Sequence, residues 1–403
     1  MKKKIFTTLL ILLFLAAIIF VISNKKVANQ IIVSTEDMYD NISGKTEDIS
    51  NVEEIQINEL QPKNATFYYN ILTDDQKKIY SSIAIAIKNL DSKAKIKDYN
   101  YVDDATTMQD VKVAVQNLFL DHPEVFYVKN DYTVSTIELV NSKRIEVELG
   151  YMVSGQSDLD DKISKINQEL EPIITAAKAM DKFNAEVYIH DKICQLATYY
   201  KYTDINEVPE QCHSIYGCFV GKSAVCDGLA KALQIALAKV NVENILVTGN
   251  LQGQAHAWNL VKLDNDWYHV DITSDKSVKN ESTNKEEIVH SYFNITAEQI
   301  KATNTIDLEA NLPVATATTY NYYIKMGKYI NVTDNFSTKF KSILDNNKDE
   351  NLIEFAVDAR VKSVPEKMVY VFQDSKYEKY VNKSSNKFNY YNILNSYILL
   401  TNK

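Results

Sequence analysis

Residues 221–233 read G-K-S-A-V-C-D-G-L-A-K-A-L, and this stretch decides the fold. A turn-forming segment opens it, and residues 227–240 are then rich in Ala and Leu, which predicts a strong helix. Cys226 therefore lies at a helix N-terminus, where unpaired N–H groups and the positive end of the dipole favour a thiolate. Asp227 mildly opposes this ionisation, so we expect a cationic partner, and histidine suits the role.

A predicted β-hairpin downstream supplies that histidine. Residues 256–263 and 267–273 read as two strands, H-A-W-N-L-V-K-L and W-Y-H-V-D-I-T, after a shorter strand at 245–248. Asp264 and Asn265 lie between them, and both tolerate the positive φ of a two-residue turn.

The turn fixes which side chains meet. It places Asp271 opposite Trp258, so His256 and Asp271 are diagonal neighbours on one face, with roughly 7–8 Å between their backbones. The carboxylate can then hold one ring nitrogen of His256 while the other nitrogen faces the thiol. His269 shares this face and is the alternative base.

These motifs, in this order and spacing, resemble the transglutaminase-like superfamily of papain-type thiol enzymes. The resemblance implies an α+β fold in which the helix bearing Cys226 packs on an antiparallel sheet bearing His256 and Asp271. By position it makes Cys226 the nucleophile, His256 the general base, in preference to His269, and Asp271 the third member. The implied reaction is attack on an amide carbonyl to give a thioester, with release to water or to an amine. The backbone N–H of Cys226 is the natural first oxyanion donor.

Other segments share the resemblance. Residues 291–294, S-Y-F-N, follow the core, and residues 67–69, F-Y-Y, and 121–126, D-H-P-E-V-F, are similar to the upstream region of anchored bacterial members. One departure follows Asp271: many relatives have Thr-Trp-Asp-Asp, whereas Ser274 and Asp275 follow Thr273 here. The missing tryptophan changes a wall of the expected cleft and removes no catalytic group.

The N-terminus carries a targeting signal. Lys2, Lys3 and Lys4 precede an uncharged apolar stretch, residues 5–22, which as a helix spans roughly 27 Å. We expect an uncleaved membrane anchor with the rest of the chain outside the cell, and a cleaved signal peptide with secretion is the alternative.

The composition of the chain limits the kinds of molecule that it is expected to bind. The net charge is −9 and the pI is about 5.3, so nucleic acid is not an expected partner. The resemblance implies a protein or peptide substrate, including cell-envelope peptides. The sequence implies no cofactor, no metal site and no calcium-binding loop.

The four cysteines lie close together in the sequence, at positions 194, 212, 218 and 226. Outside the cell the first three could form a disulfide. A zinc site could be drawn from Cys212, His213 and Cys218 with Cys194 or His190, but it lacks paired C-x-x-C spacing, and ordinary thiols fit better.

Five regions are expected along the 403 residues. They are the anchor or signal peptide (1–23), a polar stalk (24–63), an N-terminal α+β domain (64–158), the transglutaminase-like catalytic domain (159–305) and a Tyr-rich C-terminal α+β region (306–403). In the N-terminal domain we predict helices at 73–90 and 108–120, capped by Thr73 and by Thr106 or Thr107, and strands at 125–132 and 145–153. In the C-terminal region we predict strands at 320–330 and 367–373 and a helix near 339–345.

Two functions of different classes remain open from the sequence. The first is a surface cysteine enzyme, either a protease or amidase or an acyltransferase. The second is a catalytically inactive binding or assembly module that retains the papain-like core.

Overall fold

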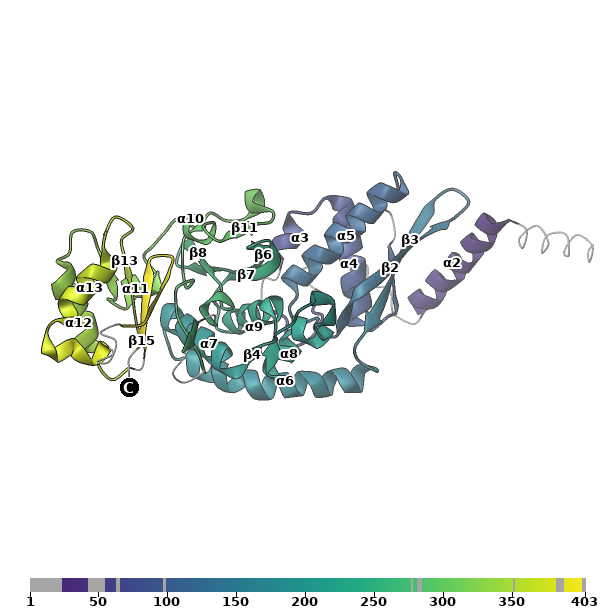
Figure 1. Ribbon diagram of the computed structural model, residues 1–403. Coiled ribbons are helices and arrows are strands. Elements are labelled where there is room, and N and C mark those ends of the chain that lie inside the picture. The colour runs from purple at the N-terminus through teal and green to yellow at the C-terminus, as the bar shows by residue number, and fades with distance from the viewer. Residues whose placement is uncertain are drawn as a thin grey trace, which may run out of the picture. The chain divides into compact units, whose positions relative to one another are not determined.

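The computed structural model describes residues 24–42, 55–62, 66–96, 99–276, 278–280, 285–350, 352–381 and 388–400 (Figure 1). The chain divides into two compact units, Met1–Asp161 and Lys162–Lys403. Within the described residues no helix has the length and apolar character needed to cross a membrane. The anchor predicted at residues 5–22 lies outside the described residues.

The first unit combines helices with an antiparallel sheet. Its helices are α2 (Lys25–Ile42), α3 (Phe67–Asn70), α4 (Asp74–Lys88) and α5 (Asp104–Asp121). Its strands, in the order β1-β3-β2, are β1 (Lys93–Ile96), β3 (Lys143–Tyr151) and β2 (Val128–Glu138). Thr73 caps α4 in a full capping box, as predicted. The cap of α5 is Asp103, not Thr106 or Thr107, because the Asp103 carboxylate accepts the Thr106 N–H at 2.7 Å and starts the helix earlier.

Two motifs of the first unit meet each other. The Asp121 carboxylate accepts the backbone N–H groups of Tyr68 and Tyr69 at 3.0 and 2.9 Å, and the Tyr80 hydroxyl donates to it at 3.1 Å. Burial raises the pKa of Asp121, while these donors favour its charged form. The F-Y-Y and D-H-P-E-V-F segments are therefore two halves of one buried polar contact.

Part of the expected stalk is structured. Residues 25–42 form α2, and residues 55–62 pack on the first unit with Leu60 fully buried. The Asn58 side chain donates to the Glu124 carbonyl at 3.1 Å. The alternating apolar residues Ile55 and Ile57, both buried, explain why this end of a polar segment packs.

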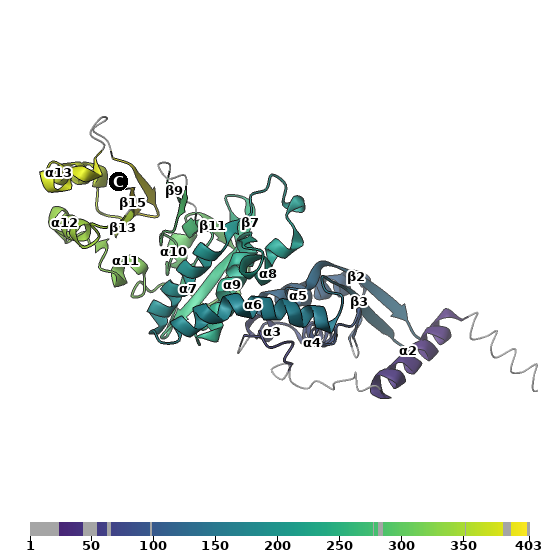
Figure 2. The same ribbon diagram turned by 90° about the horizontal axis from the view of Figure 1, so that it is seen from below.

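The second unit contains the helix and sheet that position the site. Its longer helices are α6 (Gln156–Ala177), α7 (Lys182–Leu196) and α9 (Cys226–Lys239), with the short α8 (Ile215–Phe219) and α10 (Ala297–Ile300). Its four-stranded antiparallel sheet has the order β11-β6-β7-β8: β11 (Asn304–Ile306), β6 (Asn244–Leu251), β7 (Gln254–Leu263) and β8 (Asp266–Val270). Helix α9 packs on β6 and β7, and α7 lies against α9 (Figure 2). The second unit also contains two small two-stranded sheets. One pairs β4 (Thr198–Tyr199) with β5 (Ser223–Ala224), and the other pairs β9 (Val278–Asn280) with β10 (Lys285–Glu287). The predicted α+β fold, with a cysteine helix on an antiparallel sheet, is confirmed.

The hairpin has the predicted register. Leu263 pairs with Asp266 across the turn, and Asp264 has a φ of 54°. Strand β8 ends at Val270, so Asp271 lies one residue beyond the strand.

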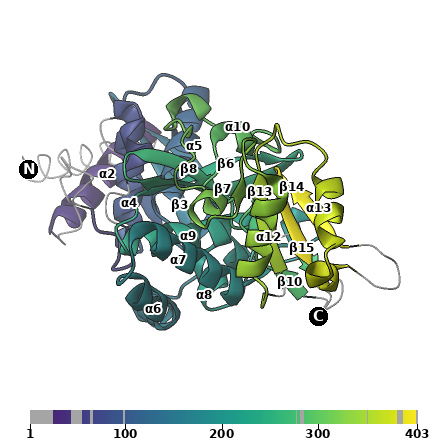
Figure 3. The same ribbon diagram turned by 90° about the vertical axis from the view of Figure 1, so that its left-hand side faces the viewer.

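The C-terminal part of this unit has its own core. Its sheet has the order β12-β13-β15-β14: β12 (Tyr329–Ile330), β13 (Leu352–Val357), β15 (Ser396–Leu400) and β14 (Tyr390–Ile393). Helices α12 (Phe336–Asn346) and α13 (Val364–Phe372) pack beside it, and the short α11 (Tyr322–Lys325) precedes β12 (Figure 3). The helix predicted near 339–345 is confirmed as α12.

Both predicted strands of this region are wrong or shortened. Residues 320–330 contain α11 and only a two-residue strand, and residues 367–373 lie mostly in α13. Val364, Met368 and Val371 are buried at helical spacing, and Pro365 lies in the first turn. Packing of that face outweighs the β propensity of the V-Y-V-F run.

Candidate active site

Cys226 is the first residue of α9, as predicted, and it is partly exposed. The other three cysteines, Cys194, Cys212 and Cys218, are buried, and all four are free thiols. The first N–H groups of a helix have no intrahelical partner, and with the dipole they favour a negative sulfur. Exposure and location together single out Cys226 as the reactive thiol.

The start of α9 is held against the preceding turn. The Val225 N–H donates to the Cys212 carbonyl at 3.0 Å. A Cβ atom on Gly228 would lie 2.4 Å from the same carbonyl oxygen, so only glycine allows this approach. Gly228 of the C-D-G motif therefore allows the first turn of α9, which begins with Cys226, to pack closely against the Cys212 carbonyl.

His256 lies between Cys226 and Asp271. Its Nε2 is 2.8 Å from Asp271 Oδ2, which leaves Nδ1 for the sulfur. Burial lowers the pKa of His256, but the charge and hydrogen bond of Asp271 and a hydrogen bond with Cys226 raise it to about 10. The structure thus brings together all three residues selected from the sequence.

Asp271 is completely buried and fully hydrogen-bonded. Its Oδ1 accepts the backbone N–H groups of Thr273 and Ser274, both at 3.1 Å, and its Oδ2 accepts the Ser274 hydroxyl at 2.7 Å. These donors fix the carboxylate in the position from which it holds His256. The sequence does not indicate this role of Ser274, because no spacing rule shows that its hydroxyl turns back to Asp271.

Comparison with known proteins agrees with this geometry. Residues 168–272 match the profile of the transglutaminase-like superfamily. The chain carries a transglutaminase-like superfamily domain. No curated protein matches the sequence.

Solved structures that resemble the chain include three of related kinds. One is a TGase, with 12% sequence identity and a TM-score of 0.27; the match covers 47% of this chain and 52% of that one. The second is the periplasmic domain of TgpA from Pseudomonas aeruginosa, with 13% identity and a TM-score of 0.22; the match covers 34% of this chain and 55% of that one. The third is a candidate cysteine protease from Cytophaga hutchinsonii, with 14% identity and a TM-score of 0.20; the match covers 36% of this chain and 66% of that one. The match thus spans between half and two thirds of each of these chains.

The S-Y-F-N segment clamps the loop that carries Asp271 in the transglutaminase-like domain. The Asp271 N–H donates to the Tyr292 carbonyl at 3.1 Å, and the Tyr292 N–H donates to Asp275 Oδ1 at 2.8 Å. The Asn294 amide donates to Glu186 at 2.9 Å, where burial raises the pKa of Glu186 to about 8. The S-Y-F-N segment therefore positions the loop that carries Asp271, and none of these contacts involves the Cys226 sulfur.

His269 is not placed as a substitute base. The buried Trp258 indole donates to His269 Nδ1 at 2.9 Å, and its ring lies near both His256 and His269, with centroid distances of 5.9 and 6.2 Å. Burial lowers the pKa of His269 to about 4, so the ring is neutral at physiological pH. Trp258 is fully buried and is part of the core beneath the hairpin.

The zinc site drawn from cysteines is not assembled. Cys194 Sγ lies 4.0 Å from the Ile272 carbonyl, and burial raises the pKa of both Cys194 and Cys218. Within the part of the chain that the structure describes, the group of side chains able to hold a metal contains His190, Asp191 and His290 and no cysteine.

Three tyrosines lie beside Val225, the residue that precedes Cys226. Tyr199, Tyr200 and Tyr202 pack on a small cluster formed by Val208, Cys212 and Val225. Burial, and then the negative charge of a Cys226 thiolate, raise the pKa of Tyr199. Tyr199 is therefore a neutral hydroxyl close to the sulfur.

Proposed function

We propose that this protein is a thiol enzyme that cleaves or transfers amide-linked acyl groups through a Cys226 thioester. The observation that carries the proposal is the position of His256, which contacts Asp271 at 2.8 Å on one side and hydrogen-bonds Cys226 on the other. The match of residues 168–272 to the transglutaminase-like superfamily supports the same assignment.

Each member of the triad has a definite task. The raised pKa of His256, about 10, keeps its ring protonated at neutral pH next to the Cys226 sulfur, which reacts as the thiolate. The sulfur attacks the amide carbonyl, and the oxyanion is stabilised by N–H groups at the start of α9, the Cys226 N–H first among them. His256 gives its proton to the departing amine, and a thioester remains. Water or a second amine, deprotonated by His256, then attacks the thioester and regenerates the thiolate.

The place of action follows from the N-terminus. Residues 5–22 would anchor the chain in the cell membrane, and the lysines before them would keep the N-terminus inside. The catalytic residues would then face the exterior, where proteins and cell-envelope peptides are the available amide substrates.

Alkylation tests whether the thiol is activated. We expect iodoacetamide to modify Cys226 of the purified full-length protein selectively near neutral pH, and His256→Ala to slow this modification by about tenfold or more, because the ion pair is lost. Cys218→Ala is the matched control, since it removes a buried thiol and should leave the labelling rate of Cys226 unchanged. Equal labelling rates in the parent and His256→Ala would instead support an inactive scaffold.

Product analysis distinguishes hydrolysis from transfer. The protein is incubated with a glutamine peptide and a tagged amine, and the products are weighed by mass spectrometry. An amine adduct that disappears in Cys226→Ala indicates acyl transfer, and glutamate or a cleaved peptide indicates hydrolysis. If Cys226 is selectively labelled but neither product forms, the glutamine peptide is not a substrate. If labelling also fails, the proposed chemistry is wrong.

A further inference from the structure

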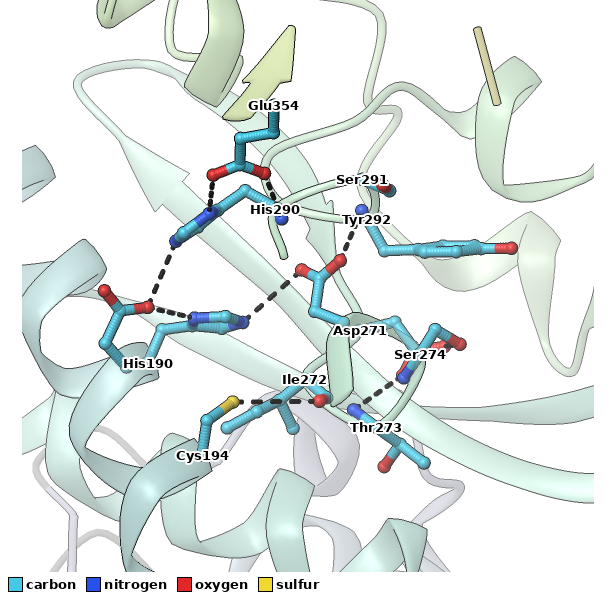
Figure 4. Close-up of polar contacts among 12 residues, drawn as sticks. His190, Cys194, Asp271, Ile272, Thr273, Ser274, His290, Ser291, Tyr292 and Glu354 are labelled. Atoms are coloured by element: carbon cyan, nitrogen blue, oxygen red, sulfur yellow. Dashed lines mark hydrogen bonds and ion pairs between the residues drawn. The ribbon is translucent and has the colours of Figure 1, made fainter. Parts of the chain in front are cut away.

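A second histidine cluster lies in the same unit, away from the sulfur. His190 on α7 and His290 in the loop before Ser291 lie close together (Figure 4). Each has a ring nitrogen within hydrogen-bond distance of one oxygen of Asp191. His190 Nδ1 is 3.0 Å and His290 Nε2 is 3.1 Å from Asp191 Oδ1. The two nitrogens and a carboxylate oxygen all lie within 4.8 Å of one another.

The opposite nitrogens of both rings face buried carboxylates. His290 Nδ1 is 2.7 Å from Glu354 Oε1, and His190 Nε2 is 3.4 Å from Asp275 Oδ2. Glu354 is itself held by the His290 backbone N–H at 3.0 Å and by the Tyr323 hydroxyl at 3.1 Å. Glu354 hydrogen-bonds His290 and fixes the orientation and tautomer of that ring, as the outer hydrogen bonds of metal-ligating histidines do. Asp275 faces His190 at ion-pair distance, without a hydrogen bond between the two side chains.

The spacing of the inner atoms suits a small metal ion. With metal–nitrogen bonds of about 2.0–2.1 Å, neighbouring ligand atoms in a tetrahedral site lie roughly 3.3 Å apart. The two nitrogen–oxygen separations of 3.0 and 3.1 Å are close to this value, and all three ligand atoms lie within 4.8 Å of one another. We propose that His190, Asp191 and His290 bind one divalent transition-metal ion of the zinc class, with Glu354 and Asp275 as acceptors behind the two imidazoles.

The donor set decides the class of metal. Two imidazole nitrogens and one carboxylate oxygen suit Zn²⁺, Co²⁺ or Ni²⁺, whereas Ca²⁺ and Mg²⁺ take oxygen ligands. The His190 side chain is fully buried, but the Asp191 side chain is 33% exposed. Solvent can therefore supply the fourth ligand and an entry path.

Charge and protons balance in this assignment. The ion takes the place of one proton on His190 Nδ1 and one on His290 Nε2. Each ring keeps its other N–H: that of His290 is donated to Glu354, and that of His190 faces Asp275. The two positive charges of the ion thus stand where two imidazolium charges would otherwise face the three carboxylates, and the net charge of the buried cluster does not change.

The ligands and the carboxylates behind them come from segments far apart in the sequence. His190 belongs to α7, Asp275 follows the Asp271 loop, and Glu354 lies on β13 of the C-terminal sheet. A bound ion would therefore fasten the C-terminal part of this unit to the transglutaminase-like domain, which makes it a stabilising site and not a catalytic one.

Metal titration of the full-length protein tests the assignment. Cys226→Ala serves as the parent, so that the thiol cannot bind the ion, and the chelator-treated protein is titrated with Zn²⁺ and with Co²⁺. We expect one equivalent of Zn²⁺, visible absorption of four-coordinate Co²⁺, and a raised melting temperature. Asp191→Asn and His290→Gln should weaken binding by about 100-fold or more, and Glu354→Gln by about tenfold. His213→Gln is the matched control, since His213 also contacts an aspartate, Asp227, at 3.0 Å and should not change binding.

A crystallographic readout does not depend on whether the variants fold. Crystals of the Cys226→Ala protein grown with Zn²⁺ should show an anomalous peak within bonding distance of His190 Nδ1 and His290 Nε2. Less than one fifth of an equivalent bound, no peak at this position, or equal binding by the parent and the folded Asp191→Asn variant would overturn the proposal. The cluster would then be an ion-pair network of protonated histidines.

Discussion

The triad and the His190–Asp191–His290 cluster use the same device and differ in what the imidazole faces. In both, a buried carboxylate fixes one nitrogen of a histidine: Asp271 at 2.8 Å from His256, and Glu354 at 2.7 Å from His290. In the triad the free nitrogen faces a partly exposed sulfur at a helix N-terminus, whereas in the cluster it faces another carboxylate. An oriented histidine is therefore not by itself evidence of catalysis, and its third partner decides the chemistry.

The largest expected effect comes from removing the sulfur. Cys226→Ala should lower amide turnover by about 10³-fold or more, because no other group can form the thioester. Steady-state assays against the substrate found by product analysis measure this. Cys218→Ala, which removes a buried thiol, is the control. If Cys226→Ala had the same turnover as the parent, the proposed difference between the triad and the cluster would be wrong, because neither site would then be catalytic.

The second-largest effect on activity is expected from removing the negative charge of Asp271, which contacts His256. Asp271→Asn keeps the shape but loses the charge that holds the imidazolium, and kcat should fall by about 10²- to 10⁴-fold. The control is His269→Gln, which alters a neutral histidine on the same face and should retain most of the activity. A kcat for Asp271→Asn within threefold of the parent would mean that the carboxylate has only a structural role.

The pH dependence of stability sharpens the contrast. The pKa of His256 is about 10 in the folded protein, above its ordinary value of 6.5, so the charged ring favours folding. This contribution is complete below about pH 6.5 and is lost as the pH rises through about 10. The free energy of unfolding of the parent, minus that of His256→Gln, should therefore fall by a few kcal/mol between these values. A flat difference would show that His256 is not charged beside the sulfur.

The smallest effect is expected at the serine behind Asp271. Ser274→Ala removes one of the hydrogen-bond donors to this carboxylate and should cost about 1 kcal/mol of stability, with a modest fall in kcat. Denaturant unfolding and kinetics measure the two effects. Ser274→Thr keeps the hydroxyl and should recover part of the kcat, whereas a purely packing role would leave both variants alike in kcat.

The sequence predicted the local geometry of the triad because short-range rules decide it. The run of Ala and Leu after Cys226 places the cysteine at a helix start, and the two-residue turn at Asp264 fixes the register that brings His256 to Asp271. The same rules failed at residues 367–373, where β propensity suggested a strand and packing of Met368 and Val371 produced a helix.

What the sequence by itself determined is the placement of the three proposed triad residues: Cys226 at a helix start, and His256 near Asp271 across a hairpin, because helix and hairpin geometry define these positions within fewer than about 50 residues. Tertiary structure alone decided the contacts between distant segments: the Ser274 hydroxyl turned back on Asp271, the S-Y-F-N backbone clamp, and Glu354 behind His290. The physical reason is that a buried polar group must find a partner once water is excluded, and the chain offers that partner only after the core has packed.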